Sequence, residues 1–265
     1  MFNLPDSRLL IDIIRKAARQ ELLTRFERVT QQLKADGSII TEADLAMQRC
    51  LSEQLKANWP DIPFLGEEMT KEQQQRLLSN SENGLWVVDP IDGTTNFSLG
   101  IPFYAVSVAL IKDNQLQLGV VYDPSRDECF NAIRDHGAFL NGKPLDLIES
   151  AEVSKITVAE VDFKRLSPQL AQKIVANPPY KSQRSFGSVA LDWCWFAAAR
   201  GDVYLHGKQN LWDFAAGSLI LEEAGGVSST LDGEPVFNGS LEPRSAVIAI
   251  NQQLFDKWYG FLTAD

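Results

Sequence analysis

Hydrophobic positions at helical and strand spacing divide the first half of the chain into recognisable elements. Apolar residues recur every three to four positions from Leu9 to Phe26 and predict an amphipathic helix. A second helix is expected to begin at Thr41, whose hydroxyl can cap it, and to end before Trp59. Short apolar runs then predict strands at 85–88, 105–111, 116–122, 129–133 and 138–140.

The second half mixes helices and strands in the same way. Strands are expected at 156–161, 202–205 and 247–250, and helices at 167–176, 189–199, 214–224 and 254–262, with Asp213 capping the helix that starts at Phe214. The dipeptides Asp113-Asn114 and Asn141-Gly142 are typical of tight turns between paired strands. The pattern predicts one compact layered α/β or α+β unit over 1–265, with an N-terminal lobe of about 1–140 and a C-terminal lobe of about 141–265.

Charge and cysteine content exclude several function classes. The 265 residues carry a net charge of −10, so direct binding to nucleic acid or to an anionic membrane is not expected. No apolar run approaches the ~18 residues of a membrane span, and the charged first helix does not resemble a signal peptide. The three cysteines are far apart and form no C-x-x-C pair, which is typical of a reducing compartment and predicts a cytoplasmic protein.

The most informative segment follows the apolar run at 85–88. Two carboxylates, Asp89 and Asp92, end this predicted strand, Pro90 stiffens the link between them, and Gly93 and Thr94 come next. Oxygen ligands of this kind suit Mg²⁺, and the carbonyl of the intervening Ile91 offers one more. Free backbone N–H groups after the strand suit a phosphate. The segment therefore predicts a metal-dependent phosphate enzyme.

Further carboxylates stand at the ends of other predicted elements. Glu67 and Glu68 follow Gly66, Asp44 lies in the first turn of the second helix, and Asp213 lies at the start of another. Each of these alone is explained by a turn, a solvated pair or a helix cap. Their combination with the Asp-Pro-x-Asp-Gly-Thr-Thr segment favours a shared site. Helix N-termini near Thr94 and Asp213 would attract an anion there. Bound metals would cancel the repulsion between the carboxylates and a phosphate.

Several segments together resemble the inositol monophosphatase family over nearly the whole chain. The resemblance is carried by Trp86–Phe97, Leu211–Gly217 with Glu223–Gly226, Gly66–Glu68, Thr41–Asp44 and Gly137–Gly142. It implies an α+β fold, a layered α-β-α-β-α sandwich with two mixed or antiparallel sheets between helix layers. It also implies a homodimer that hydrolyses phosphate monoesters with Mg²⁺ and is inhibited by Li⁺.

The resemblance also implies roles for individual residues. Those resembling the metal ligands are Glu67, Asp89, the Ile91 carbonyl, Asp92 and Asp213. Glu67 and Thr94 resemble the pair that activates the attacking water, and Asp44 resembles the residue that supports the threonine. Gly93 and Thr94 resemble the phosphate cradle, to which Asp92 and Asp213 also contribute. Ser188 aligns with a segment that lines the substrate site.

One position departs from the pattern of the inositol phosphatases. They hold a glutamate seven residues before the second-motif aspartate, where it binds inositol hydroxyls, whereas the corresponding residue here is His206, followed by Lys208. A basic group there favours a substrate with a second anionic group, and the alternative is a histidine that packs within the protein or faces water. The expected substrate is thus a small phosphorylated polyol such as myo-inositol 1-phosphate. A sugar bisphosphate such as fructose 1,6-bisphosphate, histidinol phosphate and a nucleotide 3′-phosphate are the alternatives.

The same sequence bears on two competing functions. A serine-hydrolase triad is not favoured, because His136 and His206 are the chain's two histidines and no Gly-x-Ser-x-Gly segment occurs. A non-enzymatic role is the other alternative, because some bacterial relatives in the family act as partner proteins in transcription assemblies. The acidic charge disfavours direct RNA contact there but not a protein partner.

Overall fold

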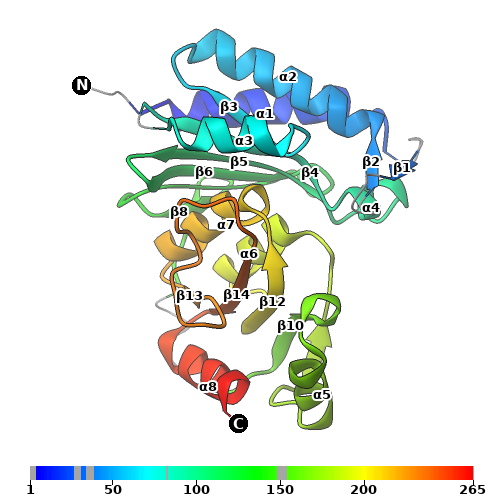
Figure 1. Ribbon diagram of the computed structural model, residues 1–265, viewed down its shortest axis with the longest axis vertical. Helices are drawn as coiled ribbons and strands as arrows, with labels where there is room; N and C mark the ends of the chain where they lie inside the picture. The colour runs from blue at the N-terminus through cyan, green and yellow to red at the C-terminus, as the bar shows by residue number, and fades with distance from the viewer. Residues whose placement is uncertain (1–3, 27–30, 34–38, 82, 148–153, 265) are drawn as a thin grey trace.

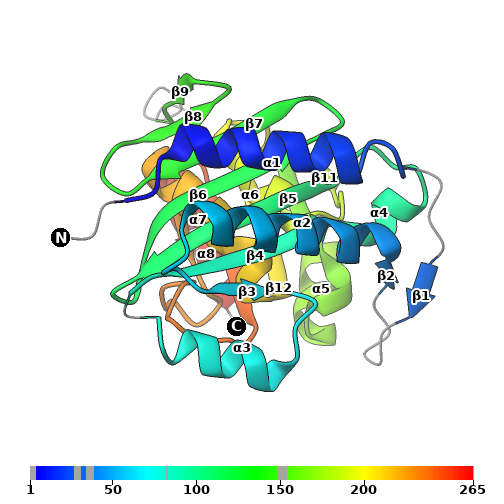
Figure 2. The ribbon, with the colours of Figure 1, turned by 90° about the horizontal axis from the view of Figure 1, so that it is seen from above.

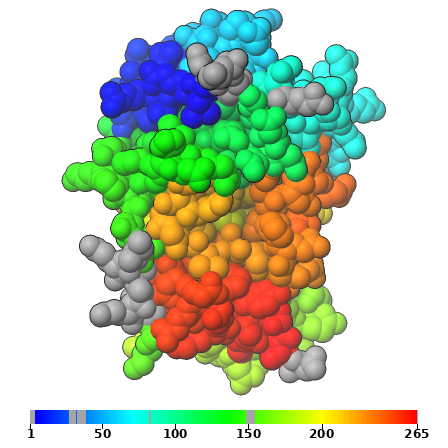
Figure 3. Space-filling model, turned by 90° about the vertical axis from the view of Figure 1, so that its left-hand side faces the viewer, coloured from blue at the N-terminus to red at the C-terminus, as the bar shows by residue number. Residues whose placement is uncertain are grey.

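The protein is a stack of five layers that follow one another from one end of the molecule to the other (Figures 1 and 3). The computed structural model describes residues 4–26, 31–33, 39–81, 83–147 and 154–264. Helices α1 and α2 form the first layer, a seven-stranded sheet the second, α6 and α7 the third, a five-stranded sheet the fourth, and α5 and α8 the last. The described helices are α1 (Ser7–Glu21), α2 (Glu42–Asn58), α3 (Lys71–Leu78), α4 (Thr94–Ser98), α5 (Pro168–Ala176), α6 (Val189–Ala197), α7 (Leu211–Glu223) and α8 (Gln252–Thr263).

The large sheet has its strands in sequence order from β3 to β9. It consists of β3 (Phe64–Gly66), β4 (Leu85–Asp92), β5 (Ala105–Lys112), β6 (Gln115–Asp123), β7 (Glu128–Ile133), β8 (Ala138–Leu140) and β9 (Lys143–Leu145). All neighbours are antiparallel except β3 and β4. Figure 2 shows α1 and α2 lying side by side across one face of this sheet, with α3 beside its β3 edge.

The small sheet has the order β11-β10-β12-β14-β13. Its strands are β10 (Val158–Asp162), β11 (Ser182–Arg184), β12 (Val203–Gln209), β13 (Val227–Ser229) and β14 (Arg244–Ala249). Strand β10 is parallel to both β11 and β12, whereas β14 is antiparallel to β12 and β13. The carboxyl ends of β11, β10 and β12 therefore meet at one edge. A separate antiparallel pair joins β1 (Gln31–Leu33) to β2 (Ile39–Thr41).

The apolar run of β4 is continuous because both faces of the large sheet are covered. Leu85 and Val87 point into the core shared with the helices of the middle layer, while Trp86 and Val88 point into the core beneath α1 and α2. Helix α7 is apolar nearly all round for the same reason, since it is enclosed between two sheets. It packs so closely on β6 that a Cβ added at Gly119 would lie 2.8 Å from the Ala216 carbonyl oxygen.

The structure confirms most of the predicted elements, including the capping box of Thr41 and Asp44 at α2. The predicted turns are also confirmed, since Asp113, Asn114, Asn141 and Gly142 all have positive φ. The first helix ends at Glu21 rather than Phe26, and residues 22–26 continue as turns in which the Thr24 and Arg25 side chains donate to the carbonyl oxygens of Gln20 and Glu21. The pattern predicts β8 at 138–140 but not the other three-residue strands, which are too short to show a period.

Two boundaries near the candidate site also differ from expectation. Helix α7 begins at Leu211, and its N-cap is Asn210 rather than Asp213. Asp213 is the third residue of the helix and completes a capping box by accepting the Asn210 N–H. The strand predicted at 202–205 runs on to Gln209. No helix within the described ranges is long and apolar enough to cross a membrane.

Candidate metal and phosphate site

A β-bulge in β4 brings two aspartates to the same side of the large sheet. Asp89 pairs with Ser107 of β5 and Asp92 with Ala105, so three steps along β4 match two along β5. In a regular strand, residues three apart face opposite sides. The extra residue instead turns Ile91 outward into the core beneath α1 and α2, and Asp92 faces inward with Asp89. Pro90 fits this position because it has no N–H to contribute to a ladder.

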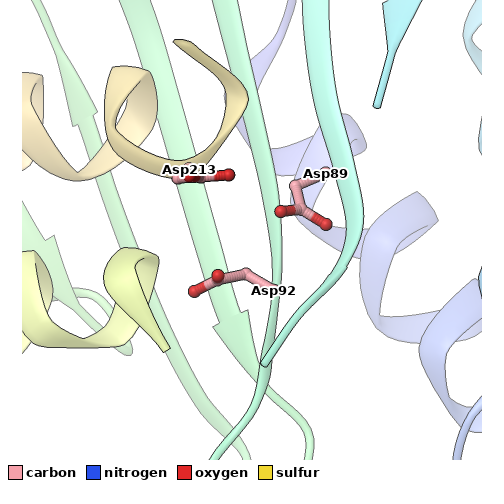
Figure 4. Close-up of side chains that lie close together, drawn as sticks. All are labelled: Asp89, Asp92 and Asp213. Atoms are coloured by element: carbon pink, nitrogen blue, oxygen red, sulfur yellow. The ribbon is translucent and has the colours of Figure 1, made fainter. Parts of the chain in front are cut away.

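Asp213 meets these two aspartates from the other side. Figure 4 shows the Asp89 and Asp92 side chains extending from β4 and that of Asp213 from the first turn of α7. One oxygen of each carboxylate lies within 4.8 Å of the others, and this is the one such acidic cluster found among the described residues. The Ser107 hydroxyl donates to the Trp212 carbonyl at 3.1 Å and fixes the start of α7 against β5.

Burial and mutual repulsion make this cluster costly without a cation. Burial, with the charges of Glu67, Asp92 and Asp213, raises the pKa of Asp89 well above its usual value. Burial, with the charges of Asp92 and Glu67, does the same to the pKa of Asp213. Buried like charges of this kind are stabilised by a metal ion or by protons. The oxygen donors fit a hard divalent cation.

Asp92 is the best-supported carboxylate of the three. Its Oδ2 accepts the Ser188 hydroxyl at 2.6 Å and the Ala190 N–H at 2.7 Å, both from the start of α6. Burial raises the pKa of Asp92 to about 7 although these two hydrogen bonds lower it. Ser188 thus acts on the carboxylate in the structure, whereas the sequence suggested a contact with substrate. The Ala190 N–H was missed, since backbone donors carry no sequence signal.

Thr94 and Asp44 form a second part of the site. The Thr94 hydroxyl lies 3.0 Å from Asp44 Oδ1 and 2.9 Å from the Ile91 carbonyl oxygen. Asp44 is fully buried, and its Oδ2 accepts both the backbone N–H and the hydroxyl of Thr41. Burial raises the pKa of Asp44, and the hydrogen bonds from Thr41 and Thr94 oppose that rise. The predicted link between Asp44 and Thr94 is therefore present.

Gly93 joins the bulge of β4 to α4 at the N-cap of that helix. Its φ of 88° lies in the left-handed region that favours glycine. A Cβ at this position would lie 3.1 Å from the Phe103 carbonyl oxygen and 3.2 Å from that of Gly187. Asn96 bonds the same two segments together, donating to the carbonyls of Phe103 and Phe186 at 2.8 and 2.7 Å. Only a glycine fits this turn without displacing the loop.

Glu67 lies beside the cluster but outside the group of three. Its backbone N–H donates to the Val88 carbonyl at 3.1 Å, which places it next to the end of β4. Its charge is the second-largest cause of the raised pKa of Asp89, after burial. The structure therefore gathers the four predicted carboxylate ligands in one region. The Ile91 carbonyl, the fifth predicted ligand, accepts the Thr94 hydroxyl.

His206 lies in the packed environment that the sequence left open as the alternative to a substrate contact. The ring is 4% exposed, Nδ1 accepts the Lys208 N–H at 3.2 Å, and Nε2 lies 3.2 Å from Asp162 Oδ2. Since Nδ1 accepts a hydrogen bond, Nε2 carries the hydrogen and donates it to Asp162. Burial lowers the pKa of His206, which favours the neutral ring. The packed alternative describes this arrangement, and a substrate contact would need a different ring orientation.

Similarity to known proteins identifies the family of this chain. Residues 7–259 match the inositol monophosphatase family. The chain belongs to this family. It is 38% identical over 200 residues to inositol monophosphatase 1 of Solanum lycopersicum, covering 73% of this chain and 72% of that protein. It is 35% identical over 205 residues to Nus factor SuhB of Pasteurella multocida, covering 76% and 75%.

Solved structures of inositol monophosphatases share the fold. The IMPase of Thermotoga maritima superimposes with a TM-score of 0.83 at 27% identity, covering 96% of this chain and 95% of that one. SaIMPase-II with inositol monophosphate bound gives a TM-score of 0.80 at 25% identity, covering 96% and 91%. The family membership and these structures make the protein a phosphate monoester hydrolase with an α+β fold.

Proposed function

We propose that this inositol monophosphatase family member hydrolyses the phosphate ester of a small polyol, with myo-inositol 1-phosphate as the reference substrate, and uses Mg²⁺. The observation that carries the proposal is the convergence of Asp89, Asp92 and Asp213 within 4.8 Å. With Glu67 and the Ile91 carbonyl, these residues would hold the metal. The carbonyl keeps a second lone pair for a ligand while it accepts the Thr94 hydroxyl.

The residues around the cluster would activate the attacking water and bind the phosphate. Bound Mg²⁺ supplies Lewis-acid stabilisation of the phosphate charge and a lowered pKa of water. The Thr94 hydroxyl directs its hydrogen toward Asp44 or Ile91, which leaves a lone pair to accept a hydrogen bond from the attacking water. Glu67 accepts the proton of that water. The backbone amides at Gly93 and Thr94 hold the phosphate, and the hydrogen bonds from Ser188 and Ala190 keep Asp92 oriented.

Three further properties belong to the same proposal. Inhibition by Li⁺ is expected because the site is built from hard oxygen ligands. A cytoplasmic location is supported by Cys50, Cys129 and Cys194, all of which are free. A homodimer is supported by Leu99 and Ile101, whose apolar side chains are exposed on the loop after α4. Dimerisation is measured by sedimentation.

The test is a phosphate-release assay with Mg²⁺, with and without Li⁺. Its panel contains myo-inositol 1-phosphate, fructose 1,6-bisphosphate, histidinol phosphate, adenosine 3′,5′-bisphosphate and glycerol 2-phosphate. Asp92→Asn removes a charged ligand and is expected to lower kcat/KM at least ~100-fold. Asp256→Asn, an exposed change in α8 of the outer layer, is the matched control and should retain activity. A native protein that releases phosphate from none of these esters would refute the proposal.

A second candidate function rests on the similarity to Nus factor SuhB. We propose as the alternative that the protein acts as a partner in a bacterial transcription assembly, through protein contacts that do not need the metal site. The net charge of −10 favours a protein partner over direct contact with RNA. Asp92→Asn separates the two functions, because a cellular role that survives in the inactive variant requires the partner function.

A further inference from the structure

The carboxyl edge of the three parallel strands carries an unusual number of positive charges for so acidic a chain. Arg184 ends β11, Lys164 and Arg165 follow β10, and Lys208 lies near the end of β12, and all four are exposed. Ligands of sheet proteins commonly bind beyond the carboxyl ends of parallel strands. The chain leaves this edge directly for the metal site, through Ser188 after β11 and Asp213 after β12.

Arg165 is the most firmly placed of these cations. Its backbone N–H donates to Asp162 Oδ1 at 3.3 Å, and its guanidinium bonds to Oδ2 of the same carboxylate. Its backbone carbonyl packs against Gly207 of β12, where an added Cβ would lie only 1.9 Å from the oxygen. The arginine is thus held over the strand that leads to Asp213, while its side chain stays 44% exposed.

The residues beneath Arg165 hold its anchor in place. Asp162 pairs with His206 across the parallel strands, and the buried ring donates to the same Oδ2 that the guanidinium binds. Among the described residues, the Arg165 guanidinium donates to Asp162. The remaining N–H groups of the guanidinium are available to a ligand. The Gly207 backbone, against which the Arg165 carbonyl packs, lies six residues before Asp213, so Arg165 contacts the segment that leads into the metal site.

We propose that Arg165 determines substrate specificity by binding a second anionic group, a phosphate or a carboxylate, on the alcohol half of the phosphate ester. The inference rests on the proposed phosphatase function and narrows its substrate class. Asp162 and His206 are positioning residues that hold the guanidinium, and Lys164, Arg184 and Lys208 add positive charge along the same edge. A planar guanidinium suits this task, since it can bind two oxygens of an anion at once.

Charge is the reason to expect an anion rather than a neutral polyol here. A neutral hydroxyl group gains little from a cluster of exposed cations, whereas a second phosphate interacts with all of them at once. The negative charge of Asp162 is paired with Arg165. It therefore does not cancel the attraction of the other three cations for an anionic ligand. His206, which the sequence suggested as the direct contact, contributes by fixing Asp162 instead.

The experiment compares two pairs of esters that differ by one anionic group. Fructose 1,6-bisphosphate is compared with fructose 1-phosphate, and 2-phosphoglycerate with glycerol 2-phosphate, so the pairs separate a phosphate from a carboxylate. The variants are Arg165→Gln and Arg165→Lys. The control is Lys181→Gln, which removes one exposed positive charge just before β11, at the opposite end of that strand. The quantity measured is the ratio of kcat/KM values within each pair.

The native protein is expected to prefer the more anionic member of at least one pair. Arg165→Gln should lower that ratio by about tenfold or more, chiefly through KM, and Arg165→Lys by less, because it keeps the charge but not the planar donors. Raised salt should reduce the native ratio. A ratio unchanged in both Arg165 variants, or one that falls equally in Lys181→Gln, overturns the inference. Hydrolysis of myo-inositol 1-phosphate by the native protein with no hydrolysis of these four esters also overturns the inference, whereas failure to hydrolyse any of the five refutes the phosphatase proposal instead.

Discussion

A buried pair of carboxyl groups offers the sharpest test of the electrostatics beside the site. Glu160 of β10 and Asp192 of α6 are each 3% exposed. Burial raises the pKa of both groups, and a hydrogen bond between the two side chains opposes this rise for Glu160 and adds to it for Asp192. Glu160 Oε2 and Asp192 Oδ1 have no donor among the described residues. A proton held between the two groups supplies that donor. We predict that the stability of the protein depends on this proton.

The magnitude follows from the titration of Glu160. Burial raises its pKa from 4.5 to about 7, although hydrogen bonds from Asp192 and the Phe186 N–H oppose the rise. The folded protein therefore holds the proton to higher pH than the unfolded chain does. The stabilisation is fully present below pH ~4.5 and is lost as the pH rises through ~7, and the change between pH 5 and pH 8 amounts to about 2–3 kcal/mol at most.

Glu160→Gln removes the part of this dependence that comes from Glu160 while keeping the shape of the side chain. The amide oxygen can still accept the Phe186 N–H, now 3.0 Å from Glu160 Oε1, and the amide nitrogen supplies the missing donor toward Asp192. We expect the free energy of unfolding of the variant, relative to the native protein, to rise by about 1–3 kcal/mol between pH 5 and pH 8. Near pH 5 the two proteins should differ by less than about 1 kcal/mol.

The assay is urea unfolding followed by circular dichroism at pH 5, 6, 7 and 8. Glu222→Gln is the control, because that side chain is 59% exposed and its loss should change stability by less than about 0.5 kcal/mol at every pH. A constant difference between native protein and Glu160→Gln across this range would show that Glu160 does not gain a proton on folding. A larger loss in the variant at pH 8 than at pH 5 would contradict the sign of the argument.

Three other predictions concern the candidate site. Ser188→Ala removes the 2.6 Å hydrogen bond to Asp92 and should lower kcat/KM about tenfold, with its melting temperature as the check on folding. Gly207→Ala forces a Cβ against the Arg165 carbonyl and should cost about 1–3 kcal/mol of stability, measured by urea unfolding; an unchanged midpoint would refute the close packing. Removal of divalent cations with EDTA should abolish phosphate release and lower the melting temperature, and Mg²⁺ should restore both, whereas retained activity would refute metal dependence.

The parts of the site that are local in sequence are predictable because local geometry creates them. Asp89, Pro90 and Asp92 lie within four residues, and the end of an apolar strand followed by a glycine already indicates that the two carboxylates gather at the end of that strand. Thr41 and Asp44 predict their own capping box for the same reason, since a helix start needs those hydrogen bonds wherever it is placed. The layered fold follows from the alternation of apolar runs with helical periods.

The position of Asp213 shows where local prediction begins to fail. The sequence places it at the start of a helix, but the choice between N-cap and third helical residue depends on Asn210 and on the Ser107 bond to the Trp212 carbonyl. The second of these interactions requires β5 to lie against α7. The bulge of β4 is a similar case, because the extra residue is defined only by the partner strand. Tertiary pairing therefore sets the final direction of each carboxylate.

The alcohol half of the substrate is the least predictable feature because its candidate contacts come from three separate strands. His206 differs from a family glutamate, and the sequence alone makes it look like a basic residue open to substrate. Only the parallel register of β10 and β12 brings Asp162 opposite His206. The exposed positive charge beside this buried pair is therefore that of Arg165, not of His206. An unpaired polar group is costly to bury, so the Nε2–H of the buried His206 requires an acceptor, and that acceptor, Asp162, also holds the guanidinium at the surface. Under the proposal for Arg165, His206 affects substrate binding through Asp162 and the guanidinium rather than by direct contact.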